Sequence, residues 1–347
     1  AHLLLFGHLP TLQELTDFNA GLSAKRALPS GLIAMMHSIP RDAWPMDVLR
    51  TATSAIGHFI PHRPDGSHET SVNSAMDLVA KFPTIVATWD RMRRGLDPIA
   101  PDPKLTTAAN FLYMRTGEKP IPEAEKALDT YLILLADHSY NASTFSARVT
   151  ASTGADIYCS ITAAVSTLAG DLHGGAPSKV MSHLEEIGLP EKAEAYVRDL
   201  LARHEKIMGM GHREYKIRDP RAAQLERMAK ELTAKSNTKW YFIARALEDA
   251  ADKVLREEKP GKRIYANVEF YTAPTLSSLG IPSDEFTCMF ACGRIAGWTA
   301  HVLEQFTHNR LIRPQATYVG PAVHPYEPIA TRHSQGTAGN GKGTLSP

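Results

Sequence analysis

The segment from Gly209 to Arg221 combines a flexible backbone with an imidazole and several cationic side chains. Glycines at positions 209 and 211 allow a ligand to approach the backbone closely, and His212 can exchange a proton near neutral pH. Lys216 and Arg221 suit a phosphate or a carboxylate. These residue types predict half of an anion-binding active site, although a glycine-ended helix followed by a solvated basic loop would give the same pattern.

Two further segments place a reactive side chain in a special setting. His173 stands in Leu172-His173-Gly174-Gly175-Ala176, directly after a nearly uncharged stretch, so a glycine turn would surround the imidazole with backbone amides. Glu269 lies in the apolar and aromatic segment Asn267-Val268-Glu269-Phe270-Tyr271, where a buried carboxylate is suited to act as a general base. The plainer alternatives are an exposed histidine at a helix end and a glutamate paired with Lys262 or Arg263.

Arginines near the end of the chain also need an explanation. Arg294 interrupts a small-residue helix in which Gly293 and Gly297 favour close packing. A buried cation needs a partner, which is either a structural ion pair or an anionic substrate. Arg310 and Arg313 offer two more guanidinium groups, which an ordinary solvated turn would also explain.

A metal site is not expected from the sequence. His58, His62 and His68 lie close together, but Pro61 disrupts the helical geometry that would present two imidazoles on one face. No cysteine or pair of acids completes a ligand shell there. We therefore expect no metal ligands in this chain.

Apolar residues recur at helical spacing along most of the chain. We therefore expect helices to position the candidate histidine, glutamate and arginine side chains. Thr11-Leu12-Gln13-Glu14 forms a capping box, and Pro122 opens another helix. Residues 155–169 are nearly uncharged and predict a helix buried on all sides, and residues 284–305 predict a long helix. No segment alternates with a clean period of two, so we expect an all-α or mainly α fold.

Composition narrows the class of protein. A length of 347 residues favours two domains, and a net charge of +1 gives no reason to expect nucleic acid or an anionic membrane as a partner. Three cysteines without a disulfide spacing favour a reduced, intracellular protein with buried thiols. No long apolar run or basic signal region is present, so we expect a cytoplasmic protein. The start at Ala1, directly before an apolar run, suggests that the natural N-terminus lies upstream.

The candidate segments occur in an order that resembles the citrate synthase family, in its shorter bacterial and archaeal form, from about Leu4 to Gly320. Ordered motifs spread over the whole chain make this a specific match. The matching segments are Ala136–Val149, Leu172–Ala176, Gly209–Arg213 through Asp219–Arg221, Asn267–Tyr271, and Gly297–His301 through Ile312–Pro314.

The resemblance implies an all-α fold with two helical domains in a homodimer. The large domain would comprise residues 1–172 and 283–330, and the smaller, mobile domain residues 173–282. The smaller domain would close over the substrates. From Arg332 the sequence becomes polar and rich in glycine, and we expect a flexible tail over residues 331–347.

The resemblance also implies a reaction, in which acetyl-CoA condenses with oxaloacetate and water to give citrate and CoA. Glu269 would take a proton from the acetyl methyl group, His173 would donate to the thioester oxygen, and His212 would polarise and protonate the ketone of oxaloacetate. Such a set is needed because a thioester methyl group is a very weak acid. A carboxylate can deprotonate it only while the enol oxygen is stabilised.

The family pattern further implies ligands for both substrates. Acetyl-CoA is a co-substrate here, and no tightly bound cofactor is expected. The oxaloacetate ligands would be His138, Arg221, Arg294 and, reaching into the neighbouring subunit's site, Arg313. Guanidinium groups suit the two carboxylates of oxaloacetate. The CoA side would be formed by Met208, Gly209, Met210, Gly211 and Lys216, with Lys216 facing the phosphates.

The chain departs from the family pattern at the general base, where the family has aspartate and this chain has Glu269. The additional methylene matters because a displacement of about 1 Å can lower a rate about a hundredfold. Glu214, Asp171 and Pro177-Ser178 are further departures, and they concern the CoA side. Two alternatives therefore stay open: a 2-methylcitrate synthase that uses propionyl-CoA, and a non-catalytic family member.

Overall fold

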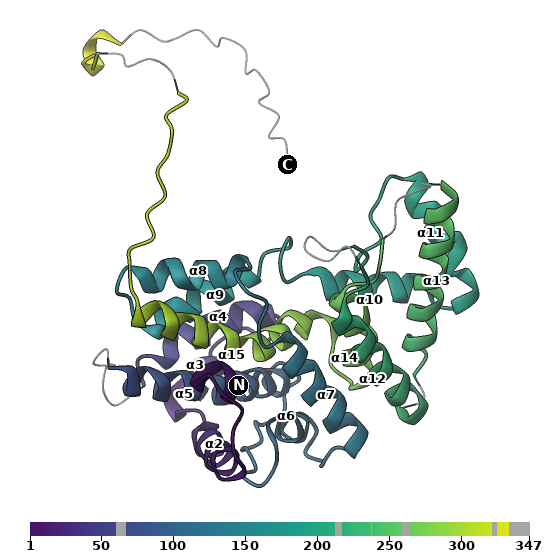
Figure 1. Cartoon of the computed structure of the whole chain (residues 1–347), viewed down its shortest axis with the longest axis horizontal. Coiled ribbons are helices and arrows are strands. Elements are labelled where there is room, and N and C mark those ends of the chain that lie inside the picture. The colour runs from purple at the N-terminus through teal and green to yellow at the C-terminus, as the bar shows by residue number, and fades with distance from the viewer. Residues whose placement is uncertain (60–66, 212–216, 237, 259–263, 321–324, 333–347) are drawn as a thin grey trace. The chain divides into compact units, whose positions relative to one another are not determined.

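The computed structural model of the chain is built from helices (Figure 1). The structure describes residues 1–59, 67–211, 217–236, 238–258, 264–320 and 325–332. Within these ranges it contains no strand, and its one isolated bridge pairs Met210 with Ala266. The prediction of an all-α fold is therefore confirmed.

The chain divides into two units, Ala1–Ile312 and Arg313–Pro347. The α-helices of the first unit are α1 (His2–Phe6), α2 (Leu12–Lys25), α3 (Ser30–His37), α4 (Pro45–Ile56), α5 (His68–Arg93), α6 (Thr107–Thr116), α7 (Pro122–Leu135), α8 (Ala142–Ser152), α9 (Ile157–Leu168), α10 (Ala176–Ile187), α11 (Ala193–Ala202), α12 (Pro220–Ser236), α13 (Trp240–Glu258), α14 (Val268–Ser278) and α15 (Phe286–Thr307). Two short 3₁₀ helices, η1 (Pro190–Lys192) and η2 (Ser283–Glu285), precede α11 and α15. The predicted division of this unit into a large and a small domain stays a prediction.

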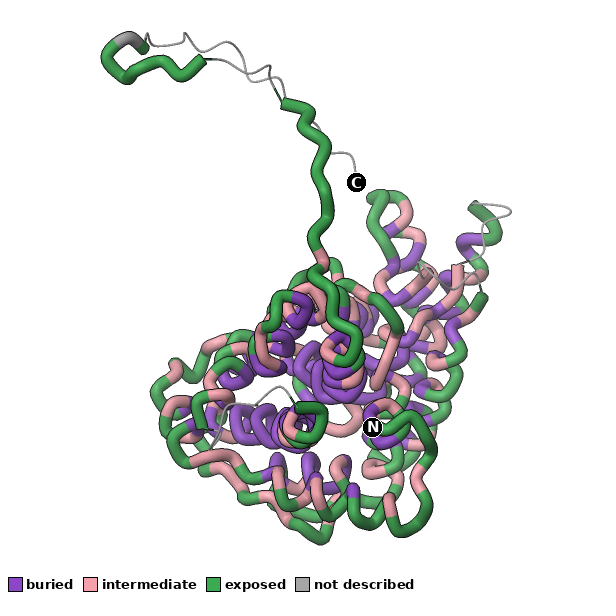
Figure 2. Tube along the Cα trace, turned by 60° about the vertical axis from the view of Figure 1, so that its left-hand side comes forward, coloured by how far each residue is buried: buried purple, intermediate pink, exposed green. Residues whose placement is uncertain are grey.

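Helix α15 forms the centre of the core. It packs against α5, α7, α8 and α9, and its residues are buried from Phe286 to Thr299. Trp298 is among its largest fully buried side chains. Figure 2 shows buried residues along the inner sides of the surrounding helices and exposed residues on their outer sides. Because α15 contacts so many helices, it can hold a buried side chain in a fixed position for a site.

Local sequence signals explain where several helices begin. Thr11 caps α2, and the predicted capping box is present, because Glu14 accepts a hydrogen bond from the backbone N–H of Thr11 while Thr11 accepts one from that of Glu14. Pro122 occupies the first turn of α7, where a missing N–H costs no helical hydrogen bond. These two predicted helix starts are confirmed.

Helix α9 differs from its prediction. We expected a helix buried on all sides, but Cys159 and Ser166 are exposed on it. The hydroxyl groups of Thr162, Ser166 and Thr167 donate to carbonyl oxygens one turn back in the helix. Hydroxyl groups of this kind form their hydrogen bonds within the helix. An uncharged helix that carries them can therefore have a face exposed to solvent.

The burial of each cysteine depends on the helix that carries it. Cys288 and Cys292 are buried one turn apart on α15, as expected, whereas Cys159 is exposed, so the expectation of buried thiols is wrong for that residue. Among the described helices, none is long and apolar enough to cross a membrane.

The second unit begins at Arg313, and its described residues include a short 3₁₀ helix, η3 (Ile329–Thr331). Its residues 313–320 and 325–330 are exposed. Most of the predicted glycine-rich tail, from residue 333 onward, lies outside the described residues.

Candidate active site

A cavity of about 670 Å³ brings together five of the residues predicted to form the site. They are contributed by the segment between α7 and α8, the turn before α10, and helices α12, α14 and α15. The cavity is lined by His138, Ser139, Tyr140, Asn141, Ala142, Leu172, His173, Arg221, Glu269, Phe290 and Arg294. Three histidine or acid side chains therefore face the same space as two guanidinium groups.

The turn between α9 and α10 fixes the position of His173. A Cβ atom on Gly174 would lie 2.3 Å from the carbonyl oxygen of Leu168 and 2.7 Å from Cγ2 of Thr287, so only glycine fits there. The hydroxyl group of Thr287 donates to the carbonyl oxygen of Gly174 over 2.9 Å. The turn is thus held from both α9 and α15.

Ser143 determines which nitrogen of His173 carries the proton. The backbone N–H of Ser143 lies 3.3 Å from Nε2 of His173, and its Oγ lies 2.8 Å from the same nitrogen. Because a backbone N–H can only donate, Nε2 is the acceptor, and the proton of the neutral imidazole is on Nδ1. Trp298 donates its indole N–H to Ser143 Oγ over 3.1 Å, which anchors this arrangement in the core.

The surroundings of His173 keep it neutral. Burial lowers its pKa to about 4, and the positive charge of Arg294 acts in the same direction. A neutral imidazole with its proton on Nδ1 is a hydrogen-bond donor that carries no charge into the site. His173 can therefore donate to a ligand oxygen at neutral pH.

Glu269 lies in the first turn of α14. The side chain of Asn267 caps this helix by accepting from the backbone N–H of Glu269 over 3.1 Å. The amide group of Asn267 also donates to the carbonyl oxygen of Gly211 over 2.8 Å. The helix N-terminus favours the charged form of a carboxylate, so the position suits a base.

Arg294 is the most unusual charge in the cavity. Its side chain is only 1% exposed, and its Nε donates to the carbonyl oxygen of Leu135 over 2.7 Å. Among the residues that the structure describes, no carboxylate forms a salt bridge with it. Burial lowers its pKa to about 10, so it is still charged at neutral pH. The negative charges of Asp137 and Glu269 act on Arg294 from a distance, and an anionic ligand would add a direct partner.

Arg221 reaches the same cavity from the first turn of α12. Its Nε and one terminal nitrogen donate to the two carboxylate oxygens of Asp219, over 3.1 and 2.8 Å. Asp219 also accepts from the backbone N–H of Val268, the residue before Glu269. Burial raises the pKa of Asp219, but the hydrogen bonds from Arg221 outweigh it, and the net shift is downward. The aspartate thus orients Arg221 and ties it to α14.

His138 lies in a turn that is fixed at both ends. Asp137 accepts from the backbone N–H of Ser139, whose φ of 48° is left-handed. Asn141 caps α8 and donates to the carbonyl oxygen of His138 over 3.3 Å. A Cβ atom on Gly297 would lie 2.2 Å from the carbonyl oxygen of Ala136, so glycine is needed for α15 to pack this closely.

Two side chains from other helices anchor Asp137. Nε2 of His301 lies 3.0 Å from Oδ1 of Asp137, and Arg148 donates to Nδ1 and to the carbonyl oxygen of His301. Because Nδ1 accepts, the proton on Nε2 is the one donated to Asp137. Burial raises the pKa of Asp137, but the hydrogen bonds from His301 and Ser139 bring it down to about 2. His301 thus holds the turn that carries His138.

Removing this hydrogen bond should weaken oxaloacetate binding. We expect His301→Phe to raise KM for oxaloacetate about tenfold, since one hydrogen bond to a charged group is lost while the ring shape stays. We expect kcat to fall less, because His301 does not line the cavity. Steady-state kinetics would measure both, with His308→Gln at the end of the same helix as the control. An unchanged KM would show that the turn does not depend on His301.

The predicted CoA-binding backbone lies beside the segment that leads to Glu269. The backbone N–H of Gly211 donates to the carbonyl oxygen of Tyr265 over 2.7 Å, and that of Asn267 donates to the carbonyl oxygen of Gly209 over 2.9 Å. Gly209 and Gly211 have φ values of 75° and 88°, which favour glycine. Met208, Gly209 and Met210 line a separate cavity of about 380 Å³ that also includes Asn267. Asn267 thus lines this second cavity and also caps the helix that carries Glu269.

His212, Lys216 and Arg313 are predicted site residues that the structure does not bring to either cavity. His212 and Lys216 lie outside the described residues. Arg313 belongs to the second unit, where it is exposed and donates to the carbonyl oxygen of Pro314 over 2.6 Å.

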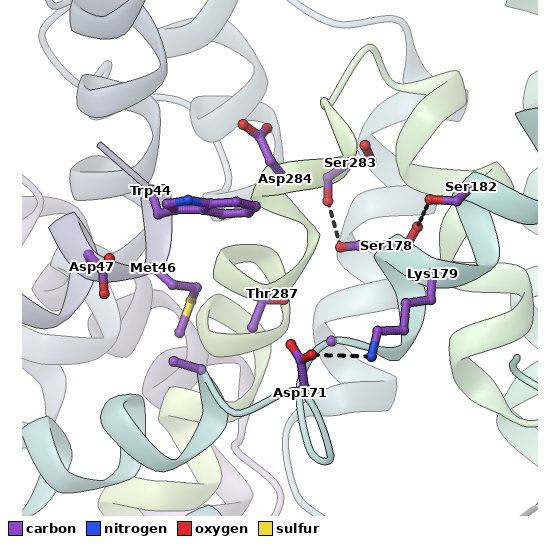
Figure 3. A pocket seen from close by; sticks show the side chains of 12 residues that line it. Trp44, Met46, Asp47, Asp171, Ser178, Lys179, Ser182, Ser283, Asp284 and Thr287 are labelled. Atoms are coloured by element: carbon purple, nitrogen blue, oxygen red, sulfur yellow. Dashed lines mark hydrogen bonds and ion pairs between the residues drawn. The ribbon is translucent and has the colours of Figure 1, made fainter. Parts of the chain in front are cut away.

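Two departures from the family pattern line a third cavity, of about 510 Å³ (Figure 3). Asp171 faces Lys179 there over 3.4 Å, and Ser178 donates to the carbonyl oxygen of Ser283 over 2.7 Å. Trp44 borders the same space. Neither Asp171 nor Ser178 lines the cavity beside Met208. In the structure Asp171 and Ser178 contact Lys179 and Ser283, and the expectation that these departures concern the CoA side stays a prediction.

Several residues that shape the site were not singled out from the sequence. Asp137, Asp219 and Asn267 lie inside the matched motifs. Their positions close to predicted site residues could have indicated that they shape the site. Ser143 lies in the motif of His138, yet its role depends on contacts with His173 and Trp298, which are far away in the chain. No local pattern indicates such contacts.

Comparisons with known proteins agree on one family. The model of the family described as citrate synthase, C-terminal domain, matches residues 1–315. The citrate synthase of Synechocystis is 44% identical over 96% of this chain and 83% of its own length. A 2-methylcitrate synthase of Corynebacterium glutamicum is 40% identical over 95% of this chain and 86% of its own length.

A solved structure supports the same relationship. It is the ternary complex of carboxymethyl coenzyme A and oxaloacetate with the citrate synthase of Thermoplasma acidophilum. That protein is 33% identical, and the alignment covers 95% of this chain and 87% of the other with a TM-score of 0.87.

Proposed function

This chain belongs to the citrate synthase family, and on that premise we propose that the cavity around Arg294 condenses acetyl-CoA with oxaloacetate and water to give citrate and CoA. The observation that carries this proposal is the burial of Arg294 in the wall of this cavity. Arg294 has a fully buried guanidinium group that forms no salt bridge among the described residues, and it shares the cavity with a second guanidinium and a carboxylate. Two cations suit a dianion, and a carboxylate beside them suits a base.

The first chemical step is enolisation of the thioester. Glu269 takes a proton from the methyl group of acetyl-CoA, and the electron pair of that C–H bond moves towards the thioester carbonyl group. Nδ1–H of His173 donates a hydrogen bond to the carbonyl oxygen, where negative charge develops. Because Ser143 holds the acceptor nitrogen of the imidazole, Nδ1 always presents its proton.

The second step joins the two substrates. The enol carbon attacks the ketone of oxaloacetate, whose carboxylates are bound by Arg221, Arg294 and His138. His212 protonates the ketone oxygen, which becomes the hydroxyl group of citryl-CoA. Water then cleaves the thioester, so that citrate and CoA leave.

We place the CoA moiety along Met208–Gly211, with Lys216 towards its phosphates. The support is structural adjacency: this segment pairs with Tyr265–Asn267, and Asn267 caps the helix that carries Glu269.

We also propose a homodimer in which Arg313 completes the neighbouring site, and a small domain over residues 173–282 that closes over the substrates. Family membership is the support for both features. Closure would move Glu269 on α14 towards Arg294 on α15, whereas His173 would stay on the turn that α9 and α15 hold. Exclusion of water would strengthen every charge interaction in the site.

The choice of acyl-CoA is the main question that experiment must answer. A family member at similar identity is a 2-methylcitrate synthase. One methylene group in an apolar pocket changes binding by only about 1 to 3 kcal/mol. We expect kcat/KM for acetyl-CoA to exceed that for propionyl-CoA by about tenfold or more. Thiol release measured with each substrate would decide, and a higher value for propionyl-CoA would identify a 2-methylcitrate synthase.

A further inference from the structure

Three potential metal ligands meet where the N-terminal helix turns back. Gly7 ends α1 with a left-handed φ of 79°, and the chain then passes through His8 towards α2. This turn brings His8 beside His2, with ring centroids 5.1 Å apart. Glu14, in the first turn of α2, completes the group. One nitrogen of each histidine and one oxygen of Glu14 all lie within 4.8 Å of one another.

Both imidazoles are oriented as metal ligands are. Nδ1 of His2 lies 3.1 Å from the carbonyl oxygen of His8, and Nδ1 of His8 lies 3.1 Å from that of Phe6. A carbonyl oxygen can only accept, so each Nδ1 carries a proton and Nε2 is left for another role. Metal-binding histidines usually donate the other ring N–H to a carbonyl or carboxylate in this way.

Glu14 is oriented by the capping box. Its Oε2 accepts from both the backbone N–H and the hydroxyl group of Thr11, over 2.7 and 2.9 Å. Its Oε1 instead faces Nε2 of His8 at 3.2 Å. The capping box therefore fixes one carboxylate oxygen and directs the other towards the two histidines.

We propose that His2, His8 and Glu14 form a binding site for Zn²⁺. Two imidazole nitrogens and one carboxylate oxygen are a ligand set that Zn²⁺ accepts, with water in the fourth position. Ligand atoms on a tetrahedral Zn²⁺ lie roughly 3.4 Å apart, given bonds of about 2.1 Å, so small side-chain rotations close the site. The ion takes the place of the contact between Nε2 of His8 and Oε1 of Glu14, and any proton bound at that nitrogen is released to solvent.

The site would add a metal-mediated link between α1 and α2, which a short turn connects along the chain. The ring of His2 packs against that of Phe18 on α2, with centroids 5.4 Å apart, and α1 packs on α15. A metal bond between His2 and Glu14 would hold α1 against α2 and thereby stabilise its contact with the core. This inference is independent of the proposed function, because none of the three ligands lines the cavity around Arg294.

Calorimetric titration of the full chain with ZnCl₂ tests the proposal. We expect about one tight site per chain, and we expect His8→Gln to weaken binding at least about a hundredfold, as the loss of one of three ligands predicts. His8 is exposed, so this change should leave the fold intact. His37→Gln, which removes an exposed histidine elsewhere, is the matched control and should bind Zn²⁺ like the parent chain.

Two further measurements separate a built site from surface binding. Zn²⁺ should raise the unfolding temperature of the parent chain but not of His8→Gln, because only a bound ion stabilises the folded state. Mg²⁺ should leave the unfolding temperature of both proteins unchanged, since it prefers oxygen ligands. Equal Zn²⁺ affinity in the parent chain and His8→Gln, or equal effects of Zn²⁺ and Mg²⁺, would overturn the proposal.

Discussion

Replacing Glu269 by glutamine is expected to lower kcat for CoA release by about a thousandfold or more, as loss of a general base predicts. Glutamine has nearly the shape of glutamate but cannot take a proton. The helix cap formed by Asn267 depends on the backbone of residue 269, so it should persist. Oxaloacetate affinity should change little, because the proposed ligands of its carboxylates are the arginines.

Thiol release and oxaloacetate binding should be measured on the same preparation. Glu231→Gln, on the outer part of α12, is the control and should behave like the parent chain. If the Glu269→Gln variant released CoA at an unchanged rate, another group would have to be the base. If oxaloacetate binding were lost together with turnover, Glu269 would instead shape the oxaloacetate site.

Glu269→Asp asks whether the longer side chain is a disadvantage. The surrounding segment Asn267–Tyr271 otherwise follows the family motif, so aspartate should restore the family's distance between base and substrate. We expect kcat to rise, by up to about a hundredfold for a displacement of about 1 Å. A lower kcat would mean that the backbone around α14 has adapted to glutamate.

Arg294→Met is expected to have the second largest effect, an increase of about a hundredfold or more in KM for oxaloacetate. A buried ion pair between substrate and enzyme is lost, which costs about 2 to 5 kcal/mol. The free energy of unfolding without ligand should stay equal or increase, because a buried cation without a carboxylate partner among the described residues is replaced by an uncharged side chain of similar length.

Weaker oxaloacetate binding together with unchanged or higher stability would distinguish a residue that binds the substrate from one that holds the fold together. Thermal unfolding with and without oxaloacetate would measure it, since a ligand stabilises only the protein that binds it. Arg294→Met should unfold at or above the temperature of the parent chain and should not respond to oxaloacetate. A large loss of stability without ligand would show that Arg294 mainly holds the core together.

The fold followed from the sequence where local signals were strong. The capping box at Thr11 and the proline at 122 located two helix starts, because both act within one turn. The exposed face of α9 was not predicted, because serine, threonine and cysteine carry no charge and satisfy their own hydrogen bonds. Burial of such a helix depends on its neighbours, and the sequence alone does not contain that information in a local form.

The sequence predicted the residues that line the cavity, but it did not predict the residues that hold them in position. The structure gathers His138, His173, Arg221, Glu269 and Arg294 around one cavity, whereas their individual roles stay predictions. The proton position on His173 required Ser143, and the anchoring of His138 required His301. These contacts join residues that are 30 and more than 150 positions apart, which no spacing rule indicates.

The proposed reaction itself is tested most directly by mixing the parent chain with acetyl-CoA and oxaloacetate and measuring free thiol and citrate together. The cavity around Arg294 and Glu269 predicts that both products appear in equal amounts and that neither forms when one substrate is omitted. Binding of oxaloacetate without release of CoA would contradict it and would identify a non-catalytic member of the family.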